Sequence, residues 1–139
     1  MSDSKAVDVA AYILALGPRT AHDLQKLVYF AQAWSLAWDG RALFDDRIEA
    51  WPNGPVAPRL FREHRLQYTV HRVAGDPEAL DEHDQAVVDA VVEFYGRMGP
   101  ARLVELTHED QPWLDARGDL PADAPSQRPI TGQAMRRFY

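Results

Sequence analysis

Hydrophobic side chains recur every three or four residues along most of this 139-residue chain, which is the spacing of one face of an α-helix. Interruptions by Gly-Pro pairs and by polar residues able to cap helices divide the pattern into segments. Helices are expected over 4–16, 20–38, 57–66, 81–98, 100–107 and 130–139, with a further short helix beginning at Pro112. The pattern predicts a mainly α fold, a single compact helical domain over residues 1–139.

The segment 20–38 is the most apolar of these and is expected at the centre of the core. Thr20 can cap its start, with Asp23 in the reciprocal position of a capping box. Its main apolar face comprises Leu24, Leu27, Val28, Ala31, Trp34 and Trp38. For the first helix, we expect Ser4 to be the cap and Leu16 to widen the buried face. For 81–98, the expected buried face comprises Val87, Ala90, Val91, Phe94 and Met98.

One stretch shows a weak alternation instead of a helical period. Leu43 and Phe44 precede an acidic pair, and Ile48 and Trp51 follow it, which predicts a short β-hairpin over 43–51. The prolines and the glycine of "WPNGPVAP" then indicate a rigid turn before the third helix.

Composition and charge narrow the function classes. Absence of cysteine excludes disulfides and thiolate metal sites and is typical of a cytoplasmic protein, and no apolar run is long enough to cross a bilayer. Residues 1–17 are interpreted as an amphipathic helix and not as a signal peptide. Residues 76–110 hold ten acidic side chains and two arginines, a charge of -8 within a chain of net charge -6. Such a segment repels nucleic acid and suits a basic protein partner, although a solvated helix face is the commoner explanation.

The stretch "ELTHEDQPW", residues 105–113, concentrates polar chemistry but fits two helix ends. His108 falls at a helix C-terminus, where an imidazole can bind free carbonyls. Asp110 can cap the next helix, with Pro112 in its first turn and Trp113 packed inward. This interpretation requires no reaction, and it is favoured over a catalytic site.

Other candidate chemistry is weak. The five histidines show no paired metal-ligand spacing, no serine sits in a nucleophile motif, and the glycines form no phosphate-binding loop. Neither a cofactor nor a metal is expected, and the chain is not expected to be an enzyme. Among the four tryptophans core packing is the commoner role, and Trp51, within the proline-bounded turn, is the best candidate for an exposed interface anchor.

Several stretches together resemble one family. "LQKLVYFAQAWSLAWDGRALFDDRIEAWPNGPVAPRLF", residues 24–61, is similar to the signature of the Panacea antitoxin domain, the SocA-like group that includes phage-associated GepA-type proteins. A second signature, Leu-Thr-His followed by Pro-Trp, matches 106–108 and 112–113, and "ITGQAMRRFY" resembles the closing helix of the family.

The resemblance implies an antitoxin of a two-gene toxin–antitoxin system that binds a cognate toxin protein. It would act by covering the active surface of the toxin or by delivering the toxin to a cytosolic AAA+ protease. The residues implied in partner binding are Lys26, Tyr29, Trp51, Asn53, His108 and Trp113.

Three alternatives remain open at this point. A nucleic-acid-binding regulator is compatible with a helical domain, but the acidic balance and the lack of an Arg/Lys-rich helix argue against it. A small hydrolase using His108 and Glu109 is the other, and a phage-associated protein of another activity is also consistent with the resemblance.

Overall fold

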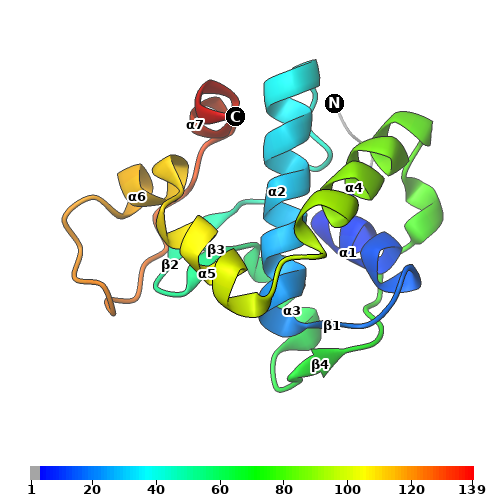
Figure 1. The fold of residues 1–139 in the computed structure, drawn as a ribbon, viewed down its shortest axis with the longest axis horizontal. Coiled ribbons are helices and arrows are strands. Elements are labelled where there is room, and N and C mark those ends of the chain that lie inside the picture. The colour runs from blue at the N-terminus through cyan, green and yellow to red at the C-terminus, as the bar shows by residue number, and fades with distance from the viewer. Residues whose placement is uncertain (1–3) are drawn as a thin grey trace.

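Residues 4–139, the part of the chain that the computed structural model describes, form seven α-helices and two small antiparallel strand pairs (Figure 1). The α-helices are α1 (Ala6–Ala15), α2 (Ala21–Asp39), α3 (Pro58–His64), α4 (Glu82–Tyr95), α5 (Pro100–His108), α6 (Gln111–Arg117) and α7 (Gly132–Phe138). The strands are β1 (Arg19–Thr20), β2 (Glu49–Trp51), β3 (Gly54–Val56) and β4 (Thr69–Val70), and a 3₁₀ helix, η1, spans Pro77–Ala79. The predicted mainly α fold is confirmed.

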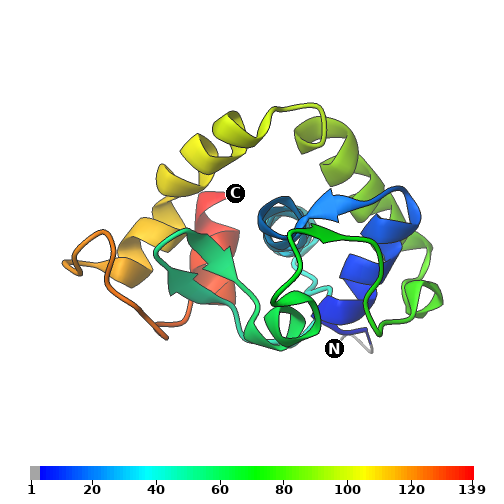
Figure 2. The same cartoon turned by 90° about the horizontal axis from the view of Figure 1, so that it is seen from below.

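Helix α2 lies at the centre and the other elements pack around it. Figure 2 shows α2 nearly end-on, with α1 and α4 on one side and α7 on the other. Residues 24–33 of α2 are all buried, which confirms its predicted central position. Its start is capped as expected, because Thr20 Oγ1 accepts a hydrogen bond of 3.2 Å from the Asp23 amide. At its end, Gly40 adopts a left-handed conformation.

The predicted hairpin over 43–51 is wrong in position. Residues 43–48 form no strand, and side chains bind the backbone of Leu43 and Phe44. Gln32 Oε1 accepts from the Leu43 amide at 2.8 Å, and Gln32 Nε2 donates to the Phe44 carbonyl at 2.9 Å. Asp46 Oδ1 accepts from the Ala6 amide at 3.0 Å and so caps α1 instead of entering a ladder.

The hairpin that does form lies further along the chain, in β2 and β3. Glu49 pairs with Val56 and Trp51 with Gly54. The turn that the sequence predicted after a hairpin over 43–51 therefore forms the tip of the observed hairpin. Gly54 has φ of 127°, a conformation that glycine adopts most readily. The β1–β4 pair, two residues on each strand, was not predicted.

Three helix details also differ from expectation. Ser4 does not cap α1, because its hydroxyl donates to the Leu43 carbonyl at 2.6 Å. Leu16 is exposed and does not widen the buried face. Helix α3 ends at His64, two residues earlier than predicted, and Leu66 lies outside it, exposed with positive φ.

The buried face of α4 is rotated from the predicted one. Asp84, Val88, Val91 and Tyr95 are its buried residues. Ala90 and Phe94, both predicted to be buried, are exposed. The rotation follows from the stacking of Tyr95 on Phe30 of α2, with ring centroids 4.0 Å apart and planes 9° apart. An apolar strip of α4 is therefore left at the surface.

Within the described residues, no helix combines the length and apolar character needed to span a membrane. The expectation for the N-terminal segment is met from Ala6 onward, where α1 is a helix with one buried face, and its part over residues 1–3 lies outside the described residues.

The loop before η1 passes very close to α1, and Gly75 permits this approach. A Cβ added at Gly75 would lie 2.2 Å from the Val7 carbonyl oxygen, which is backbone and cannot rotate away. We expect Gly75→Ala to lower the free energy of unfolding by about 1–3 kcal/mol, measured by denaturant titration. Gly132→Ala is the matched control, since only a side-chain atom of Leu36 lies near and alanine favours the helix. Equal stability of the two variants would contradict the close approach.

His64 is buried and joins α3 to α2. Gln25 Oε1 accepts from the Ala57 amide, so Gln25 Nε2 is oriented to donate to His64 Nε2 at 2.9 Å. His64 is therefore a neutral acceptor at Nε2, and its Nδ1 is buried without a partner among the described residues. Burial lowers the pKa of His64.

A lowered pKa in the fold means that the unfolded chain binds the proton more readily. The stability contributed by neutral His64 is present above the unfolded pKa of about 6.5 and is lost as the pH falls below it. We expect the melting temperature of the wild type to fall more steeply between pH 7.5 and 5.5 than that of His64→Gln. His71→Gln, at an exposed position, controls for the loss of one histidine. The same slope in all three proteins would contradict this assignment.

Candidate functional site

The stretch 105–113 forms the junction between α5 and α6, as predicted. Thr107, near the end of α5, donates its hydroxyl to the carbonyl of Val104 at 3.0 Å. Asp110 caps α6 and accepts from the Trp113 amide at 3.1 Å. Helix ends therefore account for the concentration of polar side chains at this point.

Asp110 also connects three distant parts of the chain. Its buried carboxylate accepts a 2.6 Å hydrogen bond from the Tyr29 hydroxyl on α2 and a second from the Tyr139 hydroxyl after α7. Burial raises the pKa of Asp110, and the hydrogen bonds from Tyr139 and Tyr29 oppose that rise by favouring the carboxylate. Burial is likewise the main reason that the pKa of Tyr29 is raised. A hollow of about 250 Å³ borders Asp110 and Tyr139. The hydrogen bonds of the Asp110 carboxylate hold α2, α6 and α7 together.

Trp113 fastens α6 to the hairpin. Its indole Nε1 donates to the Trp51 carbonyl at 2.9 Å. The guanidinium of Arg117 lies over the Trp113 ring, 5.5 Å from its centroid, and donates to the Ala50 carbonyl at 3.0 Å. The two stretches of the chain that resemble family signatures, one on β2 and one on α6, are thus in direct contact.

His108 differs from expectation in its contacts. It is the last residue of α5, as predicted, but it is exposed and its ring stacks on Trp113 with centroids 5.2 Å apart. Within residues 4–139, no side-chain hydrogen bond from His108 to a helix-end carbonyl is found. Its stacking covers one face of the Trp113 ring.

Of the six residues implied in partner binding, three are buried. Tyr29 and Trp113 belong to the contacts just described. Lys26 is 3% exposed on α2, and desolvation lowers its pKa, although the nearby Asp23 carboxylate opposes this. A partner could reach these three side chains only if the fold opened.

The other three have accessible surface on or beside the hairpin. Asn53 is exposed at the hairpin tip, and His108 is exposed beside it. Trp51 is half-buried, with its ring against Phe61 at 5.0 Å and its indole donating to Glu49 at 2.9 Å. These positions remain predicted contacts.

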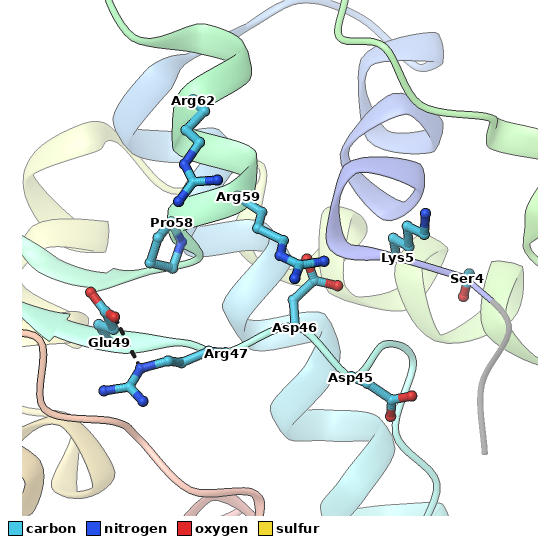
Figure 3. A pocket seen from close by; sticks show the side chains of 9 residues that line it. All are labelled: Ser4, Lys5, Asp45, Asp46, Arg47, Glu49, Pro58, Arg59 and Arg62. Atoms are coloured by element: carbon cyan, nitrogen blue, oxygen red, sulfur yellow. Dashed lines mark hydrogen bonds and ion pairs between the residues drawn. The ribbon is translucent and has the colours of Figure 1, made fainter.

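Glu49 is shared by two surface hollows. One, of about 280 Å³, is lined by Trp51, prolines and residues 126–127. The other, of about 610 Å³, is lined mainly by charged side chains and appears in Figure 3. Glu49 bridges them, because one carboxylate oxygen accepts from Trp51 and the other from Arg47 Nε at 3.0 Å.

A cluster of one half-buried and two exposed aromatic residues, here called the aromatic surface, lies where α2 meets α4. It comprises Trp34, Trp38 and Phe94, with Trp34 lying 4.6 Å from Trp38 and 5.6 Å from Phe94 between ring centroids. Trp38 is 65% exposed and Phe94 is 55% exposed. Trp38, and not Trp51, is therefore the most accessible tryptophan. The sequence pattern had assigned both exposed residues to buried faces, so no local signal separated them from the core.

Asp81, His83 and Asp84 form a group whose potential metal-ligand atoms lie within 4.8 Å of one another in the described part of the chain. Positive groups already neutralise its carboxylates. Arg41 forms ion pairs with Asp81 and, at 3.5 Å, with Asp84. His83 bridges Asp84 and Asp39, and its hydrogen bonds to these two carboxylates raise its pKa. The arrangement is an ion-pair network linking the end of α2 to the start of α4.

Comparison with known proteins connects this geometry to a family. Residues 24–114 match the family model described as "Antitoxin SocA-like, Panacea domain". Over 106 residues the chain is 32% identical to antitoxin SocA of Caulobacter vibrioides (strain NA1000 / CB15N). That match covers 65% of this chain and 55% of the relative, so the chain spans about half the length of that protein. No solved structure matches the chain.

The matched residues 24–114 include α2, the hairpin and the Asp110 junction, which are the elements joined by the buried contacts described above. The chain belongs to the SocA-like antitoxin family with a Panacea domain.

Proposed function

We propose that this protein is an antitoxin that neutralises a cognate protein toxin by binding it directly, without catalysing a reaction. Family membership and the likeness to antitoxin SocA support the antitoxin role. The buried polar groups of the Asp110 junction are engaged in holding helices together, which leaves surface contact as the means of action.

The observation that carries direct binding is the aromatic surface. Large exposed aromatic side chains cost solvation free energy unless a partner covers them, and contiguous patches of this kind mark protein interfaces. Trp38 and Phe94 project from two rigid helices that are packed through Tyr95. A partner would meet this surface with little loss of conformational entropy.

The negative charge of the segment 76–110, which includes α4, favours a toxin that has basic residues on its binding surface. Asp39 pairs with His83 and Glu93 with Arg97, but α4 and α5 lie within the segment 76–110, whose net charge is -8. A toxin with basic residues around an apolar patch would be steered to this side and then held by the aromatic rings. The same acidity disfavours operator DNA as the ligand.

Removing the exposed rings should shorten the lifetime of the complex. We expect Trp38→Ala and Phe94→Ala each to raise the dissociation rate about tenfold or more, which corresponds to about 1.4 kcal/mol, with little change in association rate. The association rate of the wild type should fall as salt rises. Surface plasmon resonance with the toxin encoded by the adjacent gene measures both rates.

Tyr68→Ala is the matched control, since Tyr68 is 79% exposed but lies on a different part of the surface, before β4. Unchanged lifetimes for both Trp38→Ala and Phe94→Ala would remove the aromatic surface from the proposal. Absence of any complex between the wild-type protein and that toxin would contradict direct binding itself.

Trp51 on the hairpin is the alternative anchor residue for the toxin. A Trp51→Ala variant distinguishes binding at the hairpin from binding at the aromatic surface. If the hairpin contacts the toxin, Trp51→Ala should raise the dissociation rate by a factor equivalent to about 2 kcal/mol or more. Its ring also packs on Phe61, so a thermal melt must first show that the variant folds. A folded Trp51→Ala protein with an unchanged complex lifetime would exclude the hairpin as the anchor.

A Tyr29 variant tests whether a buried residue of the family signature contributes to folding stability and not to toxin contact. We expect Tyr29→Phe to lower the free energy of unfolding by about 1.5–3 kcal/mol, because Asp110 loses a buried hydrogen-bond donor, and to leave toxin affinity unchanged at temperatures where the variant is folded. Tyr12→Phe is matched, because it also removes a hydroxyl bonded to an aspartate but at an exposed position, Asp89. A stable Tyr29→Phe protein that bound toxin weakly would identify Tyr29 as a contact residue.

A further inference from the structure

The hollow of about 610 Å³ lies between α3, the segment before β2 and the chain entering α1 (Figure 3). Its size is within the range of sites that bind small ligands or a few residues of a peptide. The three other hollows described have volumes of about 250–280 Å³. Its lining residues are Ser4, Lys5, Asp45, Asp46, Arg47, Glu49, Pro58, Arg59 and Arg62.

The side chains that line the hollow carry a net positive charge, whereas the whole protein carries a net negative charge. Its lining holds four cationic and three anionic side chains, a sum of +1, whereas the chain carries -6. A local excess of positive charge within an acidic protein attracts anions to that place and not to the surface in general.

Among the described residues, no lining carboxylate forms an ion pair with Arg59 or Arg62, and Glu49 pairs with Arg47 instead. Asp46 accepts from the Ala6 amide at 3.0 Å. Glu49 accepts from Arg47 at 3.0 Å and from the Trp51 indole at 2.9 Å. In Figure 3 the Asp45 side chain lies at the far end of the hollow and points away from the arginines.

Arg59 and Arg62 are left without a hydrogen bond or ion pair among residues 4–139, and both are exposed. They lie one turn apart on α3, and in Figure 3 the Arg62 side chain points toward Pro58 and the Arg59 side chain toward Asp46. A guanidinium presents a planar set of donors that matches a carboxylate in a bidentate pair. Two such groups along one wall of the hollow can each pair with one carboxylate of a peptide.

The frame around the arginines is held in place by buried contacts. Gln25 binds the Ala57 amide at 2.9 Å at the start of α3. Gln32 binds the backbone of Leu43 and Phe44, which fixes the opposite wall. A ligand would therefore find the hollow already formed, which lowers the entropy lost on binding.

We propose that this arginine-lined hollow binds an acidic peptide segment of a protein partner, with Arg59 and Arg62 pairing with neighbouring glutamate or aspartate side chains. A peptide is favoured over nucleic acid because the rest of the protein is acidic and would repel a long polyanion. Three of the lining residues belong to α3, and Figure 2 shows α3 and α4 on opposite sides of α2. Phe94 of the aromatic surface belongs to α4. The hollow is thus a second interaction surface, and it does not depend on the proposal for toxin binding.

Fluorescence anisotropy of the full chain with a labelled decapeptide of alternating glutamate and glycine tests this. A peptide with glutamine in place of glutamate is the uncharged probe. We expect the acidic peptide to bind at low salt and the glutamine peptide to bind at least tenfold more weakly. The double variant R59E/R62E should bind the acidic peptide at least tenfold more weakly than the wild type does.

The double variant R65E/R72E is the matched control, since it makes the same change in net charge at exposed arginines outside the hollow. It should retain the binding. Thermal melts establish that each variant folds, and R59Q/R62Q replaces R59E/R62E if the reversed charges prevent folding. Equal losses in the hollow and control variants, equal binding of the two peptides, or tighter binding of a ten-nucleotide thymidine oligomer than of the acidic peptide would each overturn the proposal.

Discussion

Polar side chains on a helix that is buried on nearly every side need hydrogen-bond partners from other parts of the chain. This constraint on α2 determines how the rest of the protein is arranged. Gln25, Tyr29, Gln32 and Ser35 are buried on α2, and each has a hydrogen-bond partner outside this helix. Three of the four bind backbone groups of segments that have no strand or helix at that point. An unsatisfied buried polar group costs about 1–3 kcal/mol, so these loops are held as firmly as regular elements. The central helix thereby sets the positions of both surfaces proposed to bind partners.

Most of the fold could be predicted because helix periodicity and capping residues are local signals. The Thr20 cap, the Pro100 start and the junction at Asp110 were all visible in a few adjacent residues. The hairpin could not be placed from such signals, because the side chain of Gln32 on α2 binds the backbone of Leu43 and Phe44, and Asp46 binds the Ala6 amide at the start of α1. Two-residue strand pairs such as β1–β4 carry no pattern long enough to detect.

The candidate site was predicted less well than the fold, for a related reason. Hydrophobic periodicity identifies an apolar face but does not state whether another element covers it. The apolar residues of α4 span more than one face, and the stacking of Tyr95 on Phe30 selects which of them is buried. Phe94 is left outside as a result, together with Trp38 of α2. Signature residues such as Tyr29 and Trp113, by contrast, are buried and act in holding the elements together.

The contact between Tyr139 and Asp110 has a consequence for how the chain is made. Helix α7 packs against α2, which is about one hundred residues earlier, and supplies the second hydroxyl to the Asp110 carboxylate. A ribosome releases residues in order, so one side of α2 stays uncovered until 132–139 have emerged. During that interval the nascent protein presents an apolar helix face that favours aggregation or capture by chaperones. Ribosome stalling or truncation before residue 132 would therefore leave a chain whose central helix is incompletely covered.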